Sequence, residues 1–144
     1  MSFTDYPEQL HGVKLLQRSL ERGRLGHAYL FVGDEIGELE NLAATLAKVL
    51  NCLQPVRVGT VATDCCDECV NCRKIEHGNH ADVHWVRPES RSRVVTIDQM
   101  RDLMREIYLK PTEAEYKVGV IVGADRLNAS SANSKALPRP WQRL

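Results

Sequence analysis

Residues 65–75 have the sequence Cys-Cys-Asp-Glu-Cys-Val-Asn-Cys-Arg-Lys-Ile, which places Cys66, Cys69 and Cys72 at two-residue intervals. Two cysteines at this spacing can fold back around one ion, and the third can reach the same ion from the first turn of a helix. Cys52 lies upstream and can close the fourth corner of a tetrahedron from a different element. We therefore expect a structural Zn²⁺ site made by Cys52, Cys66, Cys69 and Cys72, within a small module at about 52–76.

The cysteines and the nearby histidines also have interpretations other than a four-cysteine zinc site. Disulfides or free buried thiols are the alternatives, but disulfides are disfavoured because nothing in the chain has the character of a secreted protein. Cys65 is adjacent to Cys66 and can substitute as a ligand, although we expect it to be a bystander. His77 and His80 are close enough to be alternative ligands, but we expect them to be solvated or locally bonded. Four thiolates leave no open position for water, so the metal would stabilise the loop and perform no chemistry.

The composition is ordinary for a globular domain. The chain has 144 residues, 43% hydrophobic and 26% charged, which is enough for one domain with a core. Lys and Arg together equal Asp and Glu at 19 each, whereas a chain that binds DNA by itself usually has a basic excess. Any DNA contact is therefore expected to be shared with partners. We find neither a membrane-length apolar stretch nor a signal peptide, and reduced cysteines that hold zinc fit the cytoplasm.

Segments with apolar residues at helical spacing alternate along the chain with short apolar runs that are typical of strands. Strands separated by helices predict a parallel, Rossmann-like α/β sheet. A capping box at Thr96 and Gln99 marks the start of one helix, and Pro111 follows its end. The expected strands are residues 27–32, 82–86 and 117–122. The expected helices are residues 8–22, a stretch with the apolar face Leu39, Leu42, Ala43, Leu46 and Leu50, and a stretch with the stripe Ile97, Met100, Met104 and Ile107.

The turn after the first expected strand stands where nucleotide-binding proteins place a phosphate-binding loop. Such a loop ends in Gly-Lys-Ser/Thr, because the lysine neutralises phosphates and the hydroxyl holds Mg²⁺. Here Gly33 and Gly37 are present, but Leu39 and Glu40 replace the lysine and the hydroxyl. Four acidic residues would also repel a polyphosphate, namely Asp34, Glu35, Glu38 and Glu40. We therefore expect no ATP binding of the usual kind.

Several motifs together resemble one protein family. They are residues 27–31, Leu50-Asn51-Cys52, the cysteine run with Arg73-Lys74-Ile75, residues 78–84, Arg87-Pro88-Glu89, residues 97–101 and residues 124–128. In these stretches the chain resembles the AAA+ subunits of the bacterial DNA polymerase III clamp loader, and within them the delta-prime branch, in which a degenerate phosphate loop is typical. The resemblance covers about residues 8–134.

The resemblance implies a truncated AAA+, P-loop-NTPase-like parallel sheet with an inserted zinc module. Residues 1–133 would form an incomplete AAA+-like α/β domain, and residues 134–144 an atypical C-terminal tail. The gap from Cys52 to Cys66 is longer than is usual in the family. The family's strand order is 5-1-4-3-2, so the missing fourth strand would leave residues 29–32 and 118–122 without their shared neighbour. Because the strand edges would be unpaired, marginal stability, self-association through the sheet edges or a rearranged pairing of these two strands would follow.

For function, the resemblance implies DNA replication through a non-hydrolysing delta-prime, or stator, subunit that helps load the sliding clamp on primed DNA. Such a chain is not catalytic by itself, although it belongs to the DNA polymerase III holoenzyme. Its implied partners are the gamma/tau and delta subunits, with the clamp and primed DNA reached only through the assembly, and no membrane. The alternatives are an ATP-hydrolysing gamma/tau-like motor subunit and a stand-alone zinc-stabilised DNA-binding module.

Overall fold

The computed structural model describes residues 1–6, 10–89 and 93–127. The chain divides into two compact units, Met1–His80 and Ala81–Leu144. Each unit has its own apolar core. We call them the N-terminal unit and the C-terminal unit.

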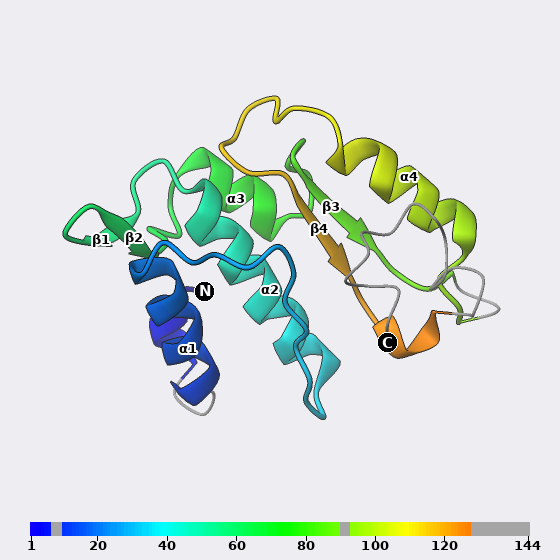
Figure 1. The fold of residues 1–144 in the computed structure, drawn as a ribbon, viewed down its shortest axis with the longest axis horizontal. Coiled ribbons are helices and arrows are strands. Elements are labelled where there is room, and N and C mark those ends of the chain that lie inside the picture. The colour runs from blue at the N-terminus through cyan, green and yellow to red at the C-terminus, as the bar shows by residue number, and fades with distance from the viewer. Residues whose placement is uncertain (7–9, 90–92, 128–144) are drawn as a thin grey trace. The chain divides into compact units, whose positions relative to one another are not determined.

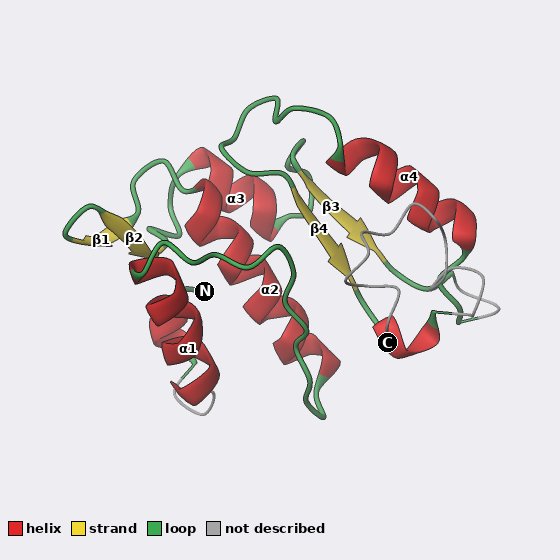
Figure 2. Cartoon of the chain, in the orientation of Figure 1, coloured by secondary structure: helices red, strands yellow, loops and turns green. Residues whose placement is uncertain are grey.

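The N-terminal unit consists of helices and one hairpin. A short 3₁₀ helix, η1 (Phe3–Asp5), precedes α1 (Leu10–Glu21), and α2 (Ile36–Asn51) follows after an extended connection. The hairpin strands β1 (Val56–Val58) and β2 (Val61–Asp64) then lead to α3 (Val70–Glu76), as Figures 1 and 2 show. The expected helices at residues 8–22 and after the phosphate-loop position are confirmed as α1 and α2, with residues 8 and 9 outside the described part.

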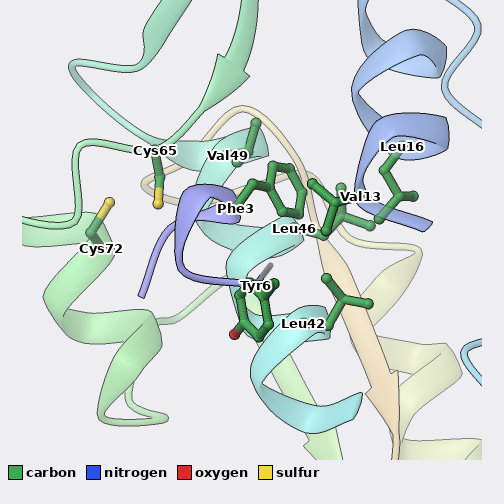
Figure 3. Close-up of a cluster of buried hydrophobic side chains, with 9 residues drawn as sticks. All are labelled: Phe3, Tyr6, Val13, Leu16, Leu42, Leu46, Val49, Cys65 and Cys72. Atoms are coloured by element: carbon green, nitrogen blue, oxygen red, sulfur yellow. The ribbon is translucent and has the colours of Figure 1, made fainter. Parts of the chain in front are cut away.

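The core of this unit forms where η1, α1 and α2 meet (Figure 3). The apolar face of α2 contacts Phe3 of η1, Tyr6 just after it and the buried face of α1. Helical spacing explains the pattern, because residues three and four apart lie on one face of a helix. The buried residues are Phe3, Tyr6, Val13, Leu16, Leu42, Leu46, Val49, Cys65 and Cys72.

The hairpin was not expected from the sequence. Its strands are antiparallel with Val58 opposite Val61, so the connection is a two-residue turn. Gly59 begins that turn at φ +64°, a conformation that glycine adopts without a steric penalty. At the end of β2, the buried Asp64 accepts hydrogen bonds from the backbone N–H groups of Phe3 and Cys65, at 3.0 and 2.8 Å. These bonds connect the start of the chain to the cysteine module.

The C-terminal unit contains the parallel strand pair that the sequence predicts. β3 (Val83–Val86) pairs in register with β4 (Val118–Ile121), and α4 (Ile97–Ile107) connects them. The N-terminus of α4 has the expected capping box, since Thr96 accepts from Gln99 N–H and the Gln99 side chain accepts from Thr96 N–H. A 3₁₀ turn, η2 (Ala124–Arg126), follows β4. The buried core residues are Val86, Val95, Met100, Leu103 and Met104.

Helix α4 lies close to β4 at Gly119. A Cβ atom at this position would be 2.5 Å from Ile107 Cδ1, closer than real Cβ contacts allow, and 3.0 Å from Leu103 Cδ1, which is a tight contact. The absence of a side chain at Gly119 therefore permits the helix to pack directly on the strand.

A buried carboxylate anchors the loop that precedes β4. Asp82 is fully buried, and its two oxygens accept backbone N–H groups of Thr112, Glu113 and Ala114 at 2.8, 2.8 and 2.9 Å. The ammonium group of Lys117 lies 3.6 Å from Asp82 Oδ1. Burial alone would raise the pKa of Asp82, but these donors outweigh it and hold the pKa below its usual value.

The first expected strand, residues 27–32, is wrong. Within the described residues this segment pairs with no strand, and the Leu30 and Val32 side chains are 59% and 84% exposed. A strand needs a neighbour that satisfies its backbone N–H and C=O groups, and β3 and β4 pair only with each other in the described part.

Other expectations fall outside what the structure describes. The atypical tail at residues 134–144, and the domain boundary at residue 133, lie beyond residue 127. Among the described helices, none is long and apolar enough to cross a membrane.

Candidate metal centre

Three separate elements contribute the four clustered cysteines. Cys52 follows the last residue of α2, and Cys66 lies just after β2. Cys69 is the N-cap of α3, and Cys72 is in the first turn of that helix, as the spacing predicts. The four sulfur atoms all lie within 4.8 Å of one another. The structure therefore brings the four candidate ligands together, although Cys52 and Cys66 are far apart in the sequence.

The separations of the sulfur atoms fit one tetrahedral ion. Cys52 Sγ lies 3.4 Å from Cys66 Sγ, 3.9 Å from Cys69 Sγ and 3.7 Å from Cys72 Sγ. A Zn–S bond of about 2.3 Å gives tetrahedral S···S edges of about 3.8 Å. All four cysteines are free thiols rather than disulfides. This arrangement could hold a metal ion without a change in the backbone.

Backbone N–H groups point at the sulfur atoms. Cys66 N–H donates to Cys52 Sγ at 3.3 Å, Cys69 N–H to Cys66 Sγ at 3.4 Å, and Cys72 N–H to Cys69 Sγ at 3.5 Å. The chain makes the turn between Cys66 and Cys69 with Asp67 at φ +62°, a left-handed conformation that Asp tolerates better than most residues. Donors around the sulfur atoms favour the thiolate form that a metal requires.

The pKa values of the thiols in the cluster are shifted in opposite directions. Burial alone would raise the pKa of Cys69, but N–H groups of Cys72 and Leu53, with the neighbouring thiols, lower it to about 6. Burial raises the pKa of Cys52, and burial together with Cys69 and Cys52 raises that of Cys72. Four crowded sulfur atoms cannot all be thiolates without a compensating cation, which a divalent metal would supply.

A buried lysine supports the metal-site turn, and the sequence reasoning missed it. Lys48 of α2 is 1% exposed, and its ammonium group donates to Asp67 Oδ1 at 2.7 Å and to Glu76 at the end of α3. The N-terminal ammonium of Met1 also contacts Asp67, and it lies 3.9 Å from Glu76. Burial alone would lower the pKa of Lys48, but Asp67 and Glu76 outweigh it and raise the pKa. The sequence signal that could have revealed Lys48 is its position among the apolar residues of Ala47–Leu50.

The other sulfur and imidazole candidates lie outside the cluster. Cys65 is 3% exposed and packs in the core of the N-terminal unit (Figure 3), where burial and the charges of Asp64 and Asp67 raise its pKa to about 11. His77 is the exposed C-cap of α3, and His80 is buried. Neither histidine belongs to the metal-ligand group found among the described residues.

The phosphate-loop position has no cation where a lysine would be expected. Gly33 precedes α2, and Gly37, Leu39 and Glu40 fall in its first turns, with Glu35 as the N-cap. The Leu39 side chain folds back over the loop, since a Cβ on Gly33 would lie 3.2 Å from Leu39 Cδ2. The adjacent groove, of about 200 Å³, is lined by Gly12, Leu16, Leu30, Phe31, Val32, Leu39 and Leu42, none of which is charged.

Comparison with known proteins identifies the family. A family model described as DNA polymerase III, delta subunit, matches residues 8–141, nearly the whole chain. The chain belongs to this family. The family assignment agrees with the resemblance of the sequence motifs and with the short parallel sheet of the C-terminal unit.

Individual relatives carry names from the same enzyme. The chain is 38% identical over 123 residues to DNA polymerase III subunit delta-prime of Bacillus subtilis (strain 168), covering 85% of this chain and 35% of the relative. It is 35% identical over 141 residues to subunit tau of Escherichia coli (strain K12), covering 96% of this chain and 21% of the relative. The tau/gamma subunit of Haemophilus influenzae is also 35% identical over 141 residues, with 96% of this chain and 19% of the relative covered. The chain thus spans between a fifth and about a third of the length of these relatives.

Proposed function

We propose that this chain acts in DNA replication as a non-hydrolysing, delta-prime-type subunit of the DNA polymerase III clamp loader. The match of the family model across residues 8–141 is the observation that carries the proposal. The similarity to delta-prime of Bacillus subtilis supports the delta-prime branch. The partners proposed are the gamma/tau and delta subunits in the cytoplasm, and the sliding clamp and primed DNA are reached through the assembly.

Within this function, the cysteine cluster holds one structural Zn²⁺. The donor set of Cys52, Cys66, Cys69 and Cys72, and its S···S separations, suit zinc better than a hard cation such as Mg²⁺. The ion supplies a rigid connection between the end of α2, the end of β2 and the start of α3. Four protein ligands leave no position for a substrate, so the role is structural.

A lack of ATP hydrolysis is the second part of the proposal. Leu39 occupies the position of the phosphate-binding lysine and packs on Gly33, and Glu40 replaces the Mg²⁺ ligand. A polyphosphate would meet acidic side chains at the start of α2 and, beside it, a groove whose lining residues carry no cationic side chain. The chain therefore serves as a structural partner to subunits that hydrolyse ATP.

The second candidate is an ATP-hydrolysing motor of the gamma/tau type. The 35% identity to tau of Escherichia coli over 96% of this chain favours it. Titration calorimetry with Mg-ATP separates the two candidates, with a tau subunit as the positive control. We expect no heat of binding up to millimolar nucleotide. Micromolar affinity that is lost when Gly33 or Gly37 is replaced by valine would refute the proposal and favour the motor candidate.

Assembly tests the main proposal directly. The chain is mixed with the gamma/tau and delta subunits of the same bacterium and separated by size exclusion. We expect co-elution at a defined stoichiometry, and a metal-free Cys69→Ser variant serves as the matched control for a damaged N-terminal unit. A folded, metal-loaded chain that elutes alone in the presence of both subunits would refute the proposed role.

A further inference from the structure

One face of α1 carries a continuous row of basic side chains. His11, Lys14, Arg18 and Arg22 recur at intervals of three and four residues, which place them on one side of the helix. All four are exposed, whereas the opposite side buries Val13 and Leu16 in the core. We call His11, Lys14, Arg18, Arg22 and Arg24 the basic face.

The end of the helix extends this face. Gly23 adopts φ +61°, Gly23 N–H donates to the carbonyl of Leu20, and Arg24 N–H donates to the carbonyl of Ser19. This pair of bonds is a Schellman motif, which ends a helix in a fixed geometry. Arg22 and Arg24 are therefore held on either side of an ordered turn rather than in an irregular loop. Both side chains are exposed.

Three cations of the basic face have no internal partner within the described part of the chain. Among those residues, the side chains of Lys14, Arg18 and Arg22 form no ion pair or hydrogen bond. Lys14 and Arg18, and likewise Arg18 and Arg22, are like charges four residues apart, an arrangement that costs a helix roughly 0.2–0.5 kcal/mol per pair. A favourable interaction with the helix dipole explains basic residues in the last turn, but it does not explain Lys14.

Helix α4 provides the contrast within the same chain. Its exposed Arg101 and Arg105 each have an aspartate three residues earlier, with N···O distances of 3.4 Å to Asp98 and 3.3 Å to Asp102. The surface arginines of α4 are therefore neutralised locally. Within the described residues no acidic side chain forms an ion pair with Lys14, Arg18 or Arg22. The exposed Glu21 lies three residues after Arg18 on the same side of α1, so the face keeps a net positive charge that is directed to solvent.

We propose that the basic face of α1 contacts the phosphate backbone of DNA. The choice of DNA among polyanions rests on the proposed role in replication. The helix rises about 1.5 Å per residue, so the cations Lys14, Arg18 and Arg22 follow it at intervals of about 6 Å over about 12 Å. That length corresponds to several phosphates of one strand, which are spaced about 3.4 Å apart along the duplex axis. The contact is electrostatic and independent of base sequence.

A membrane surface fits this face less well. A helix that lies in a lipid interface needs a broad apolar side free to enter the bilayer, and the apolar side of α1 is already buried in the core. The neutral overall charge means that the rest of the chain adds no attraction for DNA. The isolated chain therefore binds weakly, in the range of about 10⁻⁴–10⁻⁶ M that is usual for non-specific binding.

Fluorescence anisotropy with a labelled primed duplex tests the proposal on the full chain at several salt concentrations. The triple variant Lys14→Gln, Arg18→Gln, Arg22→Gln is compared with Arg101→Gln, Arg105→Gln, which also removes exposed arginines from a helix. We expect the triple variant to bind at least about tenfold more weakly at low salt. The slope of log K against log salt should fall in magnitude by about 2–3, because each phosphate that the protein neutralises adds about 0.9 to it. The α4 variant should stay within about twofold of the parent chain.

Three results would overturn the proposal: an unchanged salt slope in a folded triple variant, an equal loss in the α4 variant, or equal binding of polyglutamate at matched charge concentration. Circular dichroism verifies that each variant is folded. The measurement needs no partner subunit, so a negative result leaves the proposed clamp-loader role untouched. A failure to assemble with gamma/tau and delta would likewise leave the DNA measurement standing.

Discussion

Replacement of Asp82 by asparagine tests the anchor of the C-terminal unit. The carboxylate is fully buried and accepts three backbone N–H groups, and Lys117, whose side chain is 7% exposed, lies 3.6 Å away. Asparagine has the same shape but only one acceptor oxygen. Its amide NH₂ would face either the N–H of Thr112 or those of Glu113 and Ala114, so at least one backbone donor to this buried position loses its acceptor.

The expected loss in the free energy of unfolding follows from these contacts. A hydrogen bond to a charged group contributes about 1.5–3 kcal/mol, and a buried donor left unsatisfied costs about 1–3 kcal/mol. Lys117 also loses the partner of its nearly buried ammonium group. We therefore expect Asp82→Asn to lower the free energy of unfolding by about 3–5 kcal/mol. The matched control is Asp98→Asn, which removes an exposed acid in a surface ion pair and should cost less than about 1 kcal/mol.

Urea unfolding measured by tryptophan fluorescence gives the free energy. The chain has two tryptophans, so a Trp141→Phe background leaves Trp85 of β3 as the reporter of the C-terminal unit. The folded pKa of Asp82 is lowered, so its contribution is present above the unfolded value of about 3.9 and is lost as the pH falls through the folded pKa. The difference between parent and variant should accordingly shrink below about pH 4. A loss under about 1 kcal/mol at pH 7 would refute the reasoning.

Three further outcomes are expected from the same structure. Purified protein should contain about one Zn²⁺ per chain by metal analysis under reducing conditions and lose it in Cys69→Ser; a metal-free parent with unchanged folding would contradict the metal site. Lys48→Met should destabilise the N-terminal unit by about 1–3 kcal/mol in thermal unfolding, because it removes the charged hydrogen bonds from Lys48 to Asp67 and Glu76; an unchanged melting temperature would show that these bonds are dispensable. Gly119→Ala should cost about 1–3 kcal/mol because its Cβ meets Ile107, whereas Gly12→Ala, with open space around it in α1, should be neutral or stabilising by up to about 1 kcal/mol.

The elements with local signals were predictable from the sequence. The capping box at Thr96 and Gln99 places the start of α4, and the apolar periodicity of α2 matches its buried face. β3 and β4 were identified by short apolar runs on either side of α4, a pattern that favours a parallel pair. The cysteine spacing placed Cys72 in the first turn of a helix, which is where it lies in α3. In each case neighbours in the sequence carry the information.

The wrong strand prediction and the missed hairpin have one physical origin. Residues 27–32 have the composition of a buried strand, yet a strand exists only when another strand satisfies its backbone, and this segment pairs with none in the described part. The β1–β2 hairpin depends on Gly59 at a positive φ within a stretch that has only a weak strand pattern. Both outcomes depend on pairing between backbone segments, which a local composition does not specify.

The sequence by itself determined the candidate ligands, the loss of the phosphate-binding residues and the family, because these depend on which residues stand at which spacing. Only the tertiary structure decided that Cys52 joins the other three cysteines, that Cys65 turns into the core instead, and that Lys48 reaches Asp67 beside them. These relations join α2 to a turn that follows it by more than a dozen residues. Such contacts are set by how the helices pack, because a side chain can meet a distant partner only after the core has fixed both backbones.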